Sequence, residues 1–161
     1  IDRQMALIAS KTADSDMKKA MMYLNLDSDN ENQNWIKRRV WLLNTLSDII
    51  KTQTHDCISK GLMLSQKLST DPDLVNDSIA IMKIFLRDLI IFKFNPKKIV
   101  NLDFFDVFAD ISKHVEIKKI SEWIKELYKT EKRLTANSTL RLTLDRFFLT
   151  IVIHKGKLIY D

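Results

Sequence analysis

The chain has 161 residues, which suits one globular domain, with a formal net charge of +5 and 45% hydrophobic residues. It contains only 2 glycines and 2 prolines, too few for the many tight turns of an all-β fold. This composition indicates an all-α protein.

The single cysteine, Cys57, has no partner for an internal disulfide, and no Cys/His cluster has the spacing of a zinc site. We therefore expect Cys57 to be a small buried apolar residue, no cofactor to be bound, and the location to be the reducing cytoplasm. No apolar run is long enough to span a bilayer, so a membrane is not an expected partner. We also expect no small-molecule substrate. Because the chain begins with Ile1-Asp2 rather than Met, we interpret it as a domain excised from a longer protein.

Residues 1–26 are predicted to form two short helices, the second capped by Asp14-Ser15-Asp16 before Met17. Residues 27–34 are polar and are predicted to be a linker. Within them, Ser28 and Glu31 stand three apart, as in a capping box that starts the next helix.

Residues 35–153 are predicted to form a bundle of five to six helices, and residues 154–161 a basic tail. The central helix is expected at 72–94, with Asp71 as N-cap and Pro72 in the first turn, because its second half is apolar nearly all round. The last helix is expected to begin at an N-cap formed by Asn137 or Ser138. Four other predicted helices have apolar residues at helical spacing, which we expect to face inward. They are Ile58, Leu62, Leu64 and Leu68; Phe104, Phe105, Phe108 and Ile111; Ile117, Ile120, Ile124, Leu127, Tyr128 and Leu134; and Leu140, Leu144, Phe147, Phe148 and Ile151. In the third of these helices, Glu126 is expected on the opposite, charged face.

The sequence offers little for catalysis. Two glycines cannot build a phosphate-binding loop, and His55, His114 and His154 are dispersed without a metal-binding pattern. Nothing resembles a nucleophile elbow. We therefore expect no catalytic, cofactor-binding or metal-binding residue here.

Several charged or aromatic residues lie within apolar segments. The candidates for contacts with other subunits are Arg38, Trp41, Arg87, Arg141 and Asp145, because Arg and Trp are favoured anchors at interfaces. Arg141 and Asp145 are four apart, close enough to pair on one helix face. The alternative is that these side chains simply point outward, or that a tryptophan belongs to the core.

Three segments together resemble the C-terminal collar domains of bacterial DNA polymerase III clamp-loader subunits, most closely those of the delta-prime type. They are 35–43 (WIKRRVWLL), 85–93 (FLRDLIIFK) and 134–149 (LTANSTLRLTLDRFFL). The last is similar to the family pattern N-x-N-x-x-L-x-L-E-x-L-L-L, with Ser138-Thr139 in place of the second asparagine and Asp145 in place of the glutamate. The lead-in resembles the end of an AAA+ lid domain, whose usual GS-x-G-x-A turn corresponds to the stretch 12–20 without its glycines.

The resemblance implies a helical collar after an AAA+ lid remnant at 1–26. Collar domains of five subunits pack side by side into a ring, whereas the ATP chemistry occurs in upstream modules. The implied function is non-catalytic assembly during sliding-clamp loading in DNA replication. The implied partners are gamma/tau and delta subunits, with DNA reached only through the complex, whose polymerase activity belongs to other chains.

Two alternatives remain open at this point. The first is the collar of a gamma/tau-type subunit. The second is an unrelated basic helical module that binds nucleic acid, since residues 35–161 carry a positive balance of charge. Against the second, the charged face of 113–133 mixes lysines with glutamates, which is typical of a solvated surface.

Overall fold

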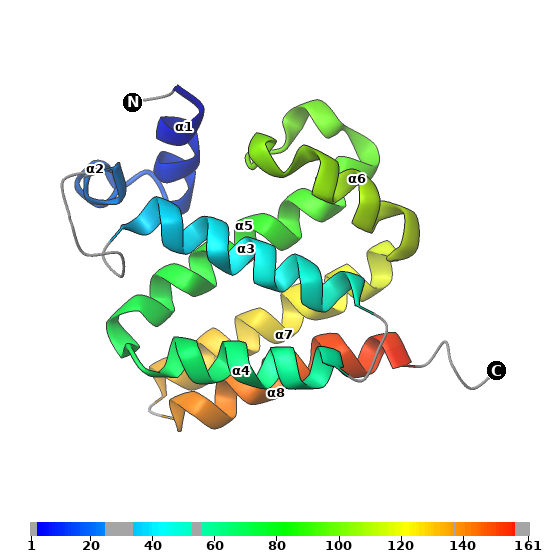
Figure 1. Ribbon diagram of the computed structural model, residues 1–161. Helices are drawn as coiled ribbons and strands as arrows, with labels where there is room; N and C mark the ends of the chain where they lie inside the picture. The colour runs from blue at the N-terminus through cyan, green and yellow to red at the C-terminus, as the bar shows by residue number, and fades with distance from the viewer. Residues whose placement is uncertain (1–2, 25–33, 53–55, 137, 157–161) are drawn as a thin grey trace.

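The computed structural model describes residues 3–24, 34–52, 56–136 and 138–156, with side chains described up to residue 153 (Figure 1). Within these ranges the chain forms eight α-helices and two 3₁₀ turns, and no strand. The prediction of an all-α fold is confirmed. The elements are α1 (Arg3–Thr12), α2 (Met17–Leu24), α3 (Trp35–Lys51), α4 (Asp56–Ser69), α5 (Pro72–Phe94), η1 (Pro96–Lys98), η2 (Leu102–Phe104), α6 (Phe105–His114), α7 (Ile117–Thr135) and α8 (Leu140–Gly156).

Helices α1 and α2 form a small pair at one corner of the bundle, where α1 packs on α5 and α2 on α3 (Figure 1). The turn between them holds Asp14 and Ser15 at φ of 52° and 67°. The Asp16 side chain then caps α2 by accepting from the Lys19 N–H at 3.1 Å. Two left-handed residues and one cap thus reverse the chain without glycine.

Helix α3 begins one residue after Asn34, whose side chain accepts a hydrogen bond from the Lys37 N–H at 3.1 Å. The predicted capping box of Ser28 and Glu31 lies outside the described residues. At this end of α3 the Trp35 ring stacks on Tyr23 of α2, with centroids 4.6 Å apart.

Helix α5 crosses the molecule and packs against α1, α3, α4, α6 and α7 (Figure 1). Its bounds match the prediction. Pro72 occupies the first turn and Asp71 the N-cap position, although the Asp71 side chain makes no capping bond. The apolar second half is buried on most sides, as Met82, Phe85 and Leu86 are inaccessible to solvent.

Helix α8 lies alongside α4 and also packs against α7 (Figure 1). Gly61 of α4 allows the close approach, since a Cβ added there would stand 3.3 Å from the Cβ of Phe148. The side of α4 that carries Cys57, Gly61 and Leu64 therefore faces the interior. The prediction that Ile58 faces inward is wrong, because Ile58 lies on the solvent side of this face.

Four further sequence predictions need correction. Phe105 is exposed because α6 begins only at that residue, after the η2 turn, and its ring rests edge-on against Phe92, with centroids 5.0 Å apart. Tyr128 is exposed, while Glu126, expected on the solvent face of α7, is buried. Helix α8 begins at Leu140, so Ser138 stands one residue too early to be the N-cap, and Asn137 lies outside the described part of the chain.

Candidate functional site

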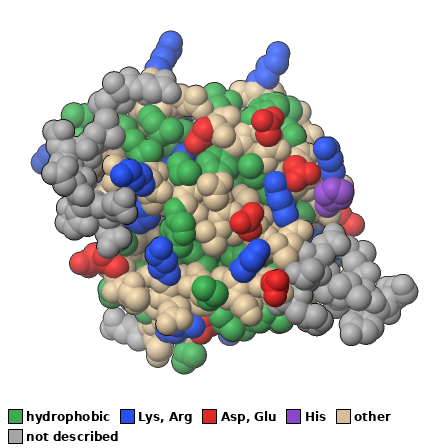
Figure 2. Space-filling view, in the orientation of Figure 1, with side chains coloured by type: hydrophobic (Ala, Val, Ile, Leu, Met, Phe, Trp, Pro, Cys, Tyr) green, Lys and Arg blue, Asp and Glu red, His purple; other side chains and the backbone are tan. Residues whose placement is uncertain are grey.

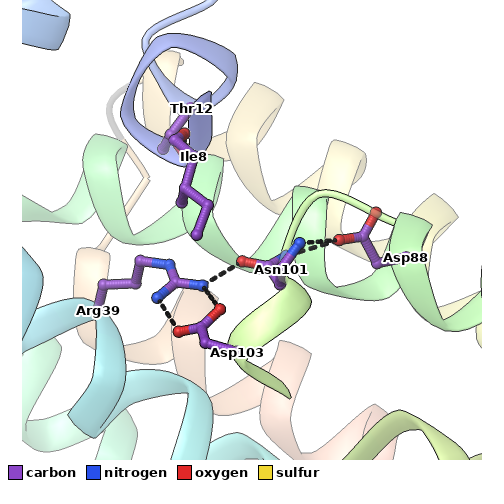
Figure 3. Close-up of polar contacts among 6 residues, drawn as sticks. All are labelled: Ile8, Thr12, Arg39, Asp88, Asn101 and Asp103. Carbon is purple, nitrogen blue, oxygen red and sulfur yellow. Dashed lines mark hydrogen bonds and ion pairs between the residues drawn. The ribbon is translucent and has the colours of Figure 1, made fainter. Parts of the chain in front are cut away.

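A buried polar network joins α3, α5 and the segment that follows α5 (Figure 3). Arg39 of α3 is 1% exposed. Its guanidinium donates to both carboxylate oxygens of Asp103, from Nη1 at 2.7 Å and from Nη2 at 2.9 Å. Nη2 also donates to the side-chain oxygen of Asn101. A buried charge is held in this way by a bidentate ion pair and an additional acceptor.

Asn101 connects this ion pair to the buried carboxylate of Asp88 on α5 (Figure 3). Asp88 Oδ2 accepts from the backbone N–H groups of Val100 at 2.9 Å and Asn101 at 2.8 Å, and from Asn101 Nδ2 at 2.8 Å. Burial raises the pKa of the Asp88 carboxyl, and the hydrogen bonds from Asn101 and Val100 oppose that shift. The network thus fixes the backbone of 99–103 against two helices.

Sequence reasoning missed this network, although the sequence carries a signal for it. Arg39 lies three, four and seven residues before Leu42, Leu43 and Leu46, so it shares their apolar face. A charge on such a face needs a partner, and Asp103 supplies it from far along the chain.

Arg38, the first predicted contact residue, is committed mainly to contacts within the chain. Its Nη2 lies 3.4 Å from Asp77 Oδ2 on α5. The Tyr23 hydroxyl donates to Asp77 Oδ1 at 2.6 Å, and Lys19 Nζ lies 3.0 Å from the same oxygen. Burial lowers the pKa of the Arg38 guanidinium, against the opposing effect of Asp77. This cluster therefore ties α2 to α3 and α5.

Trp41 and Arg87, the next two, lie apart from each other on α3 and α5. Trp41 is half-buried, and Lys67 Nζ of α4 stands 4.2 Å from the centre of its ring, a cation–π contact. The Arg87 side chain is half-exposed, and its Nη1 donates to Asp88 Oδ1 at 3.1 Å. Neither residue is enclosed in the core.

The predicted pairing of Arg141 and Asp145 on α8 is confirmed. Arg141 Nε donates to Asp145 Oδ1 at 2.9 Å. Arg141 Nη2 also donates to the Leu62 carbonyl of α4 at 3.3 Å, and Ser65 Oγ donates back to the Arg141 carbonyl at 3.3 Å. The pair therefore lies at the outer junction of α4 and α8.

Large apolar side chains are exposed beside this junction. Leu142 follows Arg141 and is 67% exposed, while Met63 follows Leu62 and is 68% exposed. Exposed apolar side chains that form a contiguous patch rimmed by polar groups are typical of surfaces that another protein covers.

A further charged cluster, also missed, joins α7 to α8. Glu126 lies 2.7 Å from Arg133 Nη1, 3.3 Å from Arg146 Nε and 3.6 Å from Lys129 Nζ. Burial favours a higher pKa for the Glu126 carboxyl, but the Arg133 hydrogen bond and the three positive charges outweigh it and lower the pKa. The cluster reinforces the packing of the last two helices.

The described residues hold no group of three or more His, Cys, Asp or Glu that could bind a metal ion, and Cys57 is buried. None of the helices in the described part is long and apolar enough to cross a membrane. Figure 2 shows acidic and basic side chains interspersed with apolar ones over the face seen in Figure 1. The five predicted contact residues lie on three helices, and of them Arg141 and Asp145 are in direct contact.

Comparison of the chain with protein-family models, with curated proteins and with solved structures gave no match in any of the three. The proposed function therefore rests on the sequence resemblance and on the geometry of the described residues.

Proposed function

We propose that this chain is a non-catalytic assembly domain, whose helical bundle docks against other subunits of a larger complex. The observation that carries the proposal is the outer junction of α4 and α8. There Leu142, which follows Arg141 in the sequence, and Met63, which follows Leu62, expose most of their side chains to solvent. The bundle itself gains little from a solvent-exposed leucine and methionine, whereas a partner that covers them gains their burial.

More particularly, we propose that the chain is the collar of a clamp-loader subunit of the delta-prime type, acting with gamma/tau and delta subunits in sliding-clamp loading. Support comes from the end of the family pattern on α8. Its leucine positions at Leu144, Phe147 and Phe148 are buried. Its leucine position at Leu142 is exposed, so the pattern includes a leucine that the isolated bundle does not need.

The turn before α2 gives separate support. When GS-x-G-x-A is counted back from Ala20, its first glycine falls on Ser15 and its serine on Asp16. Ser15 has φ of 67°, a conformation that favours glycine, and Asp16 caps α2 as a serine would. A positive φ at the first glycine position supports the resemblance, although both glycines of the pattern, which fall on Ser15 and Lys18, are absent.

Reconstitution tests the proposal. The chain is mixed with the delta and gamma/tau subunits encoded by the same genome, and assembly is followed by size-exclusion chromatography and native mass spectrometry. We expect the unmodified chain to join the complex. Met63→Asp with Leu142→Asp should weaken assembly by about tenfold or more, because charges replace the apolar centre of the contact.

Met22→Asp is the matched control, since Met22 is equally exposed but lies on α2. Circular dichroism and the unfolding midpoint should be unchanged for all variants. Failure of the unmodified chain to join any of these subunits would overturn the clamp-loader assignment. Full assembly by the Met63 and Leu142 variant, and by the Ala variant of Arg141, would overturn this choice of surface.

The same preparation distinguishes the alternatives. Binding of duplex DNA by the chain alone, with a salt dependence matching several phosphate contacts, would favour the nucleic-acid-binding module. An AAA+ module encoded upstream with an intact phosphate loop would favour a gamma/tau-type subunit, and a degenerate loop the delta-prime type.

A further inference from the structure

A hollow of about 570 Å³ opens between α1, the end of α5 and the segment that follows α5. Its apolar lining comes from Leu7 of α1, Ile91 and Phe94 of α5, and Ile99 and Val100 of the following segment. Phe94 is 75% exposed, and Leu7 is also exposed. The hollow is large enough for one or two side chains of a ligand, and it offers them an aliphatic surface with one accessible aromatic ring.

The charged residues that line the hollow are all positive. They are Lys11 of α1, Arg87 of α5, and Lys97 and Lys98 of η1. Arg87 contacts Asp88, whose carboxylate is buried among the N–H groups of Val100 and Asn101 and is inaccessible to solvent. The three lysines are exposed and form no ion pair with any of the described residues. The hollow therefore presents unneutralised positive charge around an apolar floor.

Lysines after the end of a helix also offset the partial negative charge of its last carbonyl groups, and Lys97 and Lys98 follow the end of α5 in this way. That effect accounts for charge near the helix end. It does not account for an exposed Phe94, or for a fourth cation, Lys11, contributed by a different helix. The combination is better matched to a ligand that carries both negative charge and an apolar group.

We propose that this hollow binds an acidic peptide segment of another protein, with one apolar side chain in the hollow and carboxylates beside the lysines. A nucleic acid fits the lining less well, because single strands need successive aromatic stacking platforms and the lining offers only Phe94. The proposal does not rest on the assembly function, since the hollow lies at the α1–α5 junction and the proposed subunit contact at the α4–α8 junction.

A displayed library of random peptides tests the proposal. The library is selected on the full chain alone, and the Lys97→Glu, Lys98→Glu variant is kept for the affinity measurements. The enriched sequences are then made with a fluorescent label, and their affinity is measured by anisotropy. We expect enrichment of peptides in which Asp or Glu flanks Leu, Ile or Phe. Their affinity should fall about tenfold or more on the double variant and should weaken as salt rises.

Phe94→Ala should also weaken binding, because it removes the accessible ring from the hollow. The matched control is Lys118→Glu with Lys125→Glu, the same charge change at exposed positions of α7, which should leave the affinity unchanged. Circular dichroism confirms the fold of each variant.

Two outcomes would overturn the proposal. One is that no peptide is enriched, or that the enriched peptides lack acidic residues or bind the Lys97 and Lys98 variant equally well. The other is that oligothymidylate binds and displaces the selected peptides, which assigns the surface to nucleic acid. Assembly with clamp-loader subunits is measured separately, so the two proposals fail independently.

Discussion

Arg39 and Asp103 form a bidentate ion pair, with guanidinium-to-carboxylate distances of 2.7 and 2.9 Å. The pair joins residues 64 positions apart in the chain, because Arg39 lies in α3 and Asp103 in the turn before α6. It therefore stabilises a contact between elements that are far apart in the sequence, with the Arg39 guanidinium buried and the Asp103 carboxylate partly exposed to solvent.

Replacing Arg39 with Ala should destabilise the bundle by about 2–4 kcal/mol, because it removes a fully packed side chain and leaves the buried Asn101 oxygen without its donor, whereas the partly exposed Asp103 carboxylate can regain water. Lys37→Ala, at an exposed position one residue before Arg38, should stay within about 0.5 kcal/mol of the parent. Urea unfolding followed by circular dichroism gives both values. Equal changes in the free energy of unfolding for the two substitutions would contradict the view that the Arg39–Asp103 ion pair stabilises the fold.

Asp88 should make stability fall as pH rises above the ordinary pKa of an aspartate. Burial raises the folded-state pKa of this carboxyl, so over the interval between the unfolded and folded values the native state holds the extra proton. Stability decreases with pH wherever the native state binds more protons than the unfolded state. Asp88→Asn should remove this part of the pH dependence, as urea unfolding at a series of pH values would show.

Asp88→Ala removes both the negative charge and the hydrogen-bond acceptor, whereas Asp88→Asn removes only the charge. It leaves the N–H groups of Val100 and Asn101 without their acceptor, at about 1–3 kcal/mol for each buried donor. Asp88→Asn should cost much less, because an amide oxygen can still accept from them. A pH dependence that is the same in the parent and in Asp88→Asn would show that other groups set it.

Ser15→Gly should stabilise the chain by about 0.5–1 kcal/mol. Ser15 has φ of 67°, which strains an L-residue with a Cβ, and glycine adopts it freely at some cost in unfolded-state entropy. The thermal midpoint should rise for Ser15→Gly and should not rise for Ser15→Ala. A fall in the midpoint for the glycine variant would argue against this turn conformation.

Gly61→Leu should destabilise the bundle by about 1–3 kcal/mol, because the added atoms would push α8 away from α4 at Phe148. Gly61→Ala should be nearly neutral. Its Cβ would stand 3.3 Å from Phe148 Cβ and force a small shift, while alanine favours the helix by about 1 kcal/mol over glycine. Denaturant unfolding of both variants measures the difference, and equal stabilities would show that α4 and α8 are not closely packed here.

The helices themselves could be predicted from the sequence, because local signals define their ends. Asp71-Pro72 and Asn95-Pro96 bound α5 where expected, and its apolar second half identifies the central element. Which side of a helix faces inward was harder to predict. Ile58 fits the apolar spacing of α4, but the side of α4 that faces inward is the one with Gly61, which packs on Phe148. Ile58 lies away from that side and is exposed, and only the position of α8 shows this.

The candidate site could be predicted only where its parts are close in sequence. Arg141 and Asp145 are one helical turn apart, so spacing alone predicts their contact. The partners of Arg39, Asp88 and Glu126 come from other elements, and no local pattern indicates how those elements pack. The basic hollow was missed for the same reason, since α1 contributes Lys11 and the end of α5 contributes Phe94.

The closeness of Gly61 and Phe148 also bears on how the protein is made. On the ribosome α4 is made well before α8, so the side of α4 that meets Phe148 at Gly61 is uncovered until α8 follows, although α3 and α5 can already pack on other parts of α4. Chains whose contacts span long sequence separations fold slowly, and apolar surface that is exposed in the meantime is prone to aggregation. The packing of α4 on α8 can therefore form only after α8 has been translated.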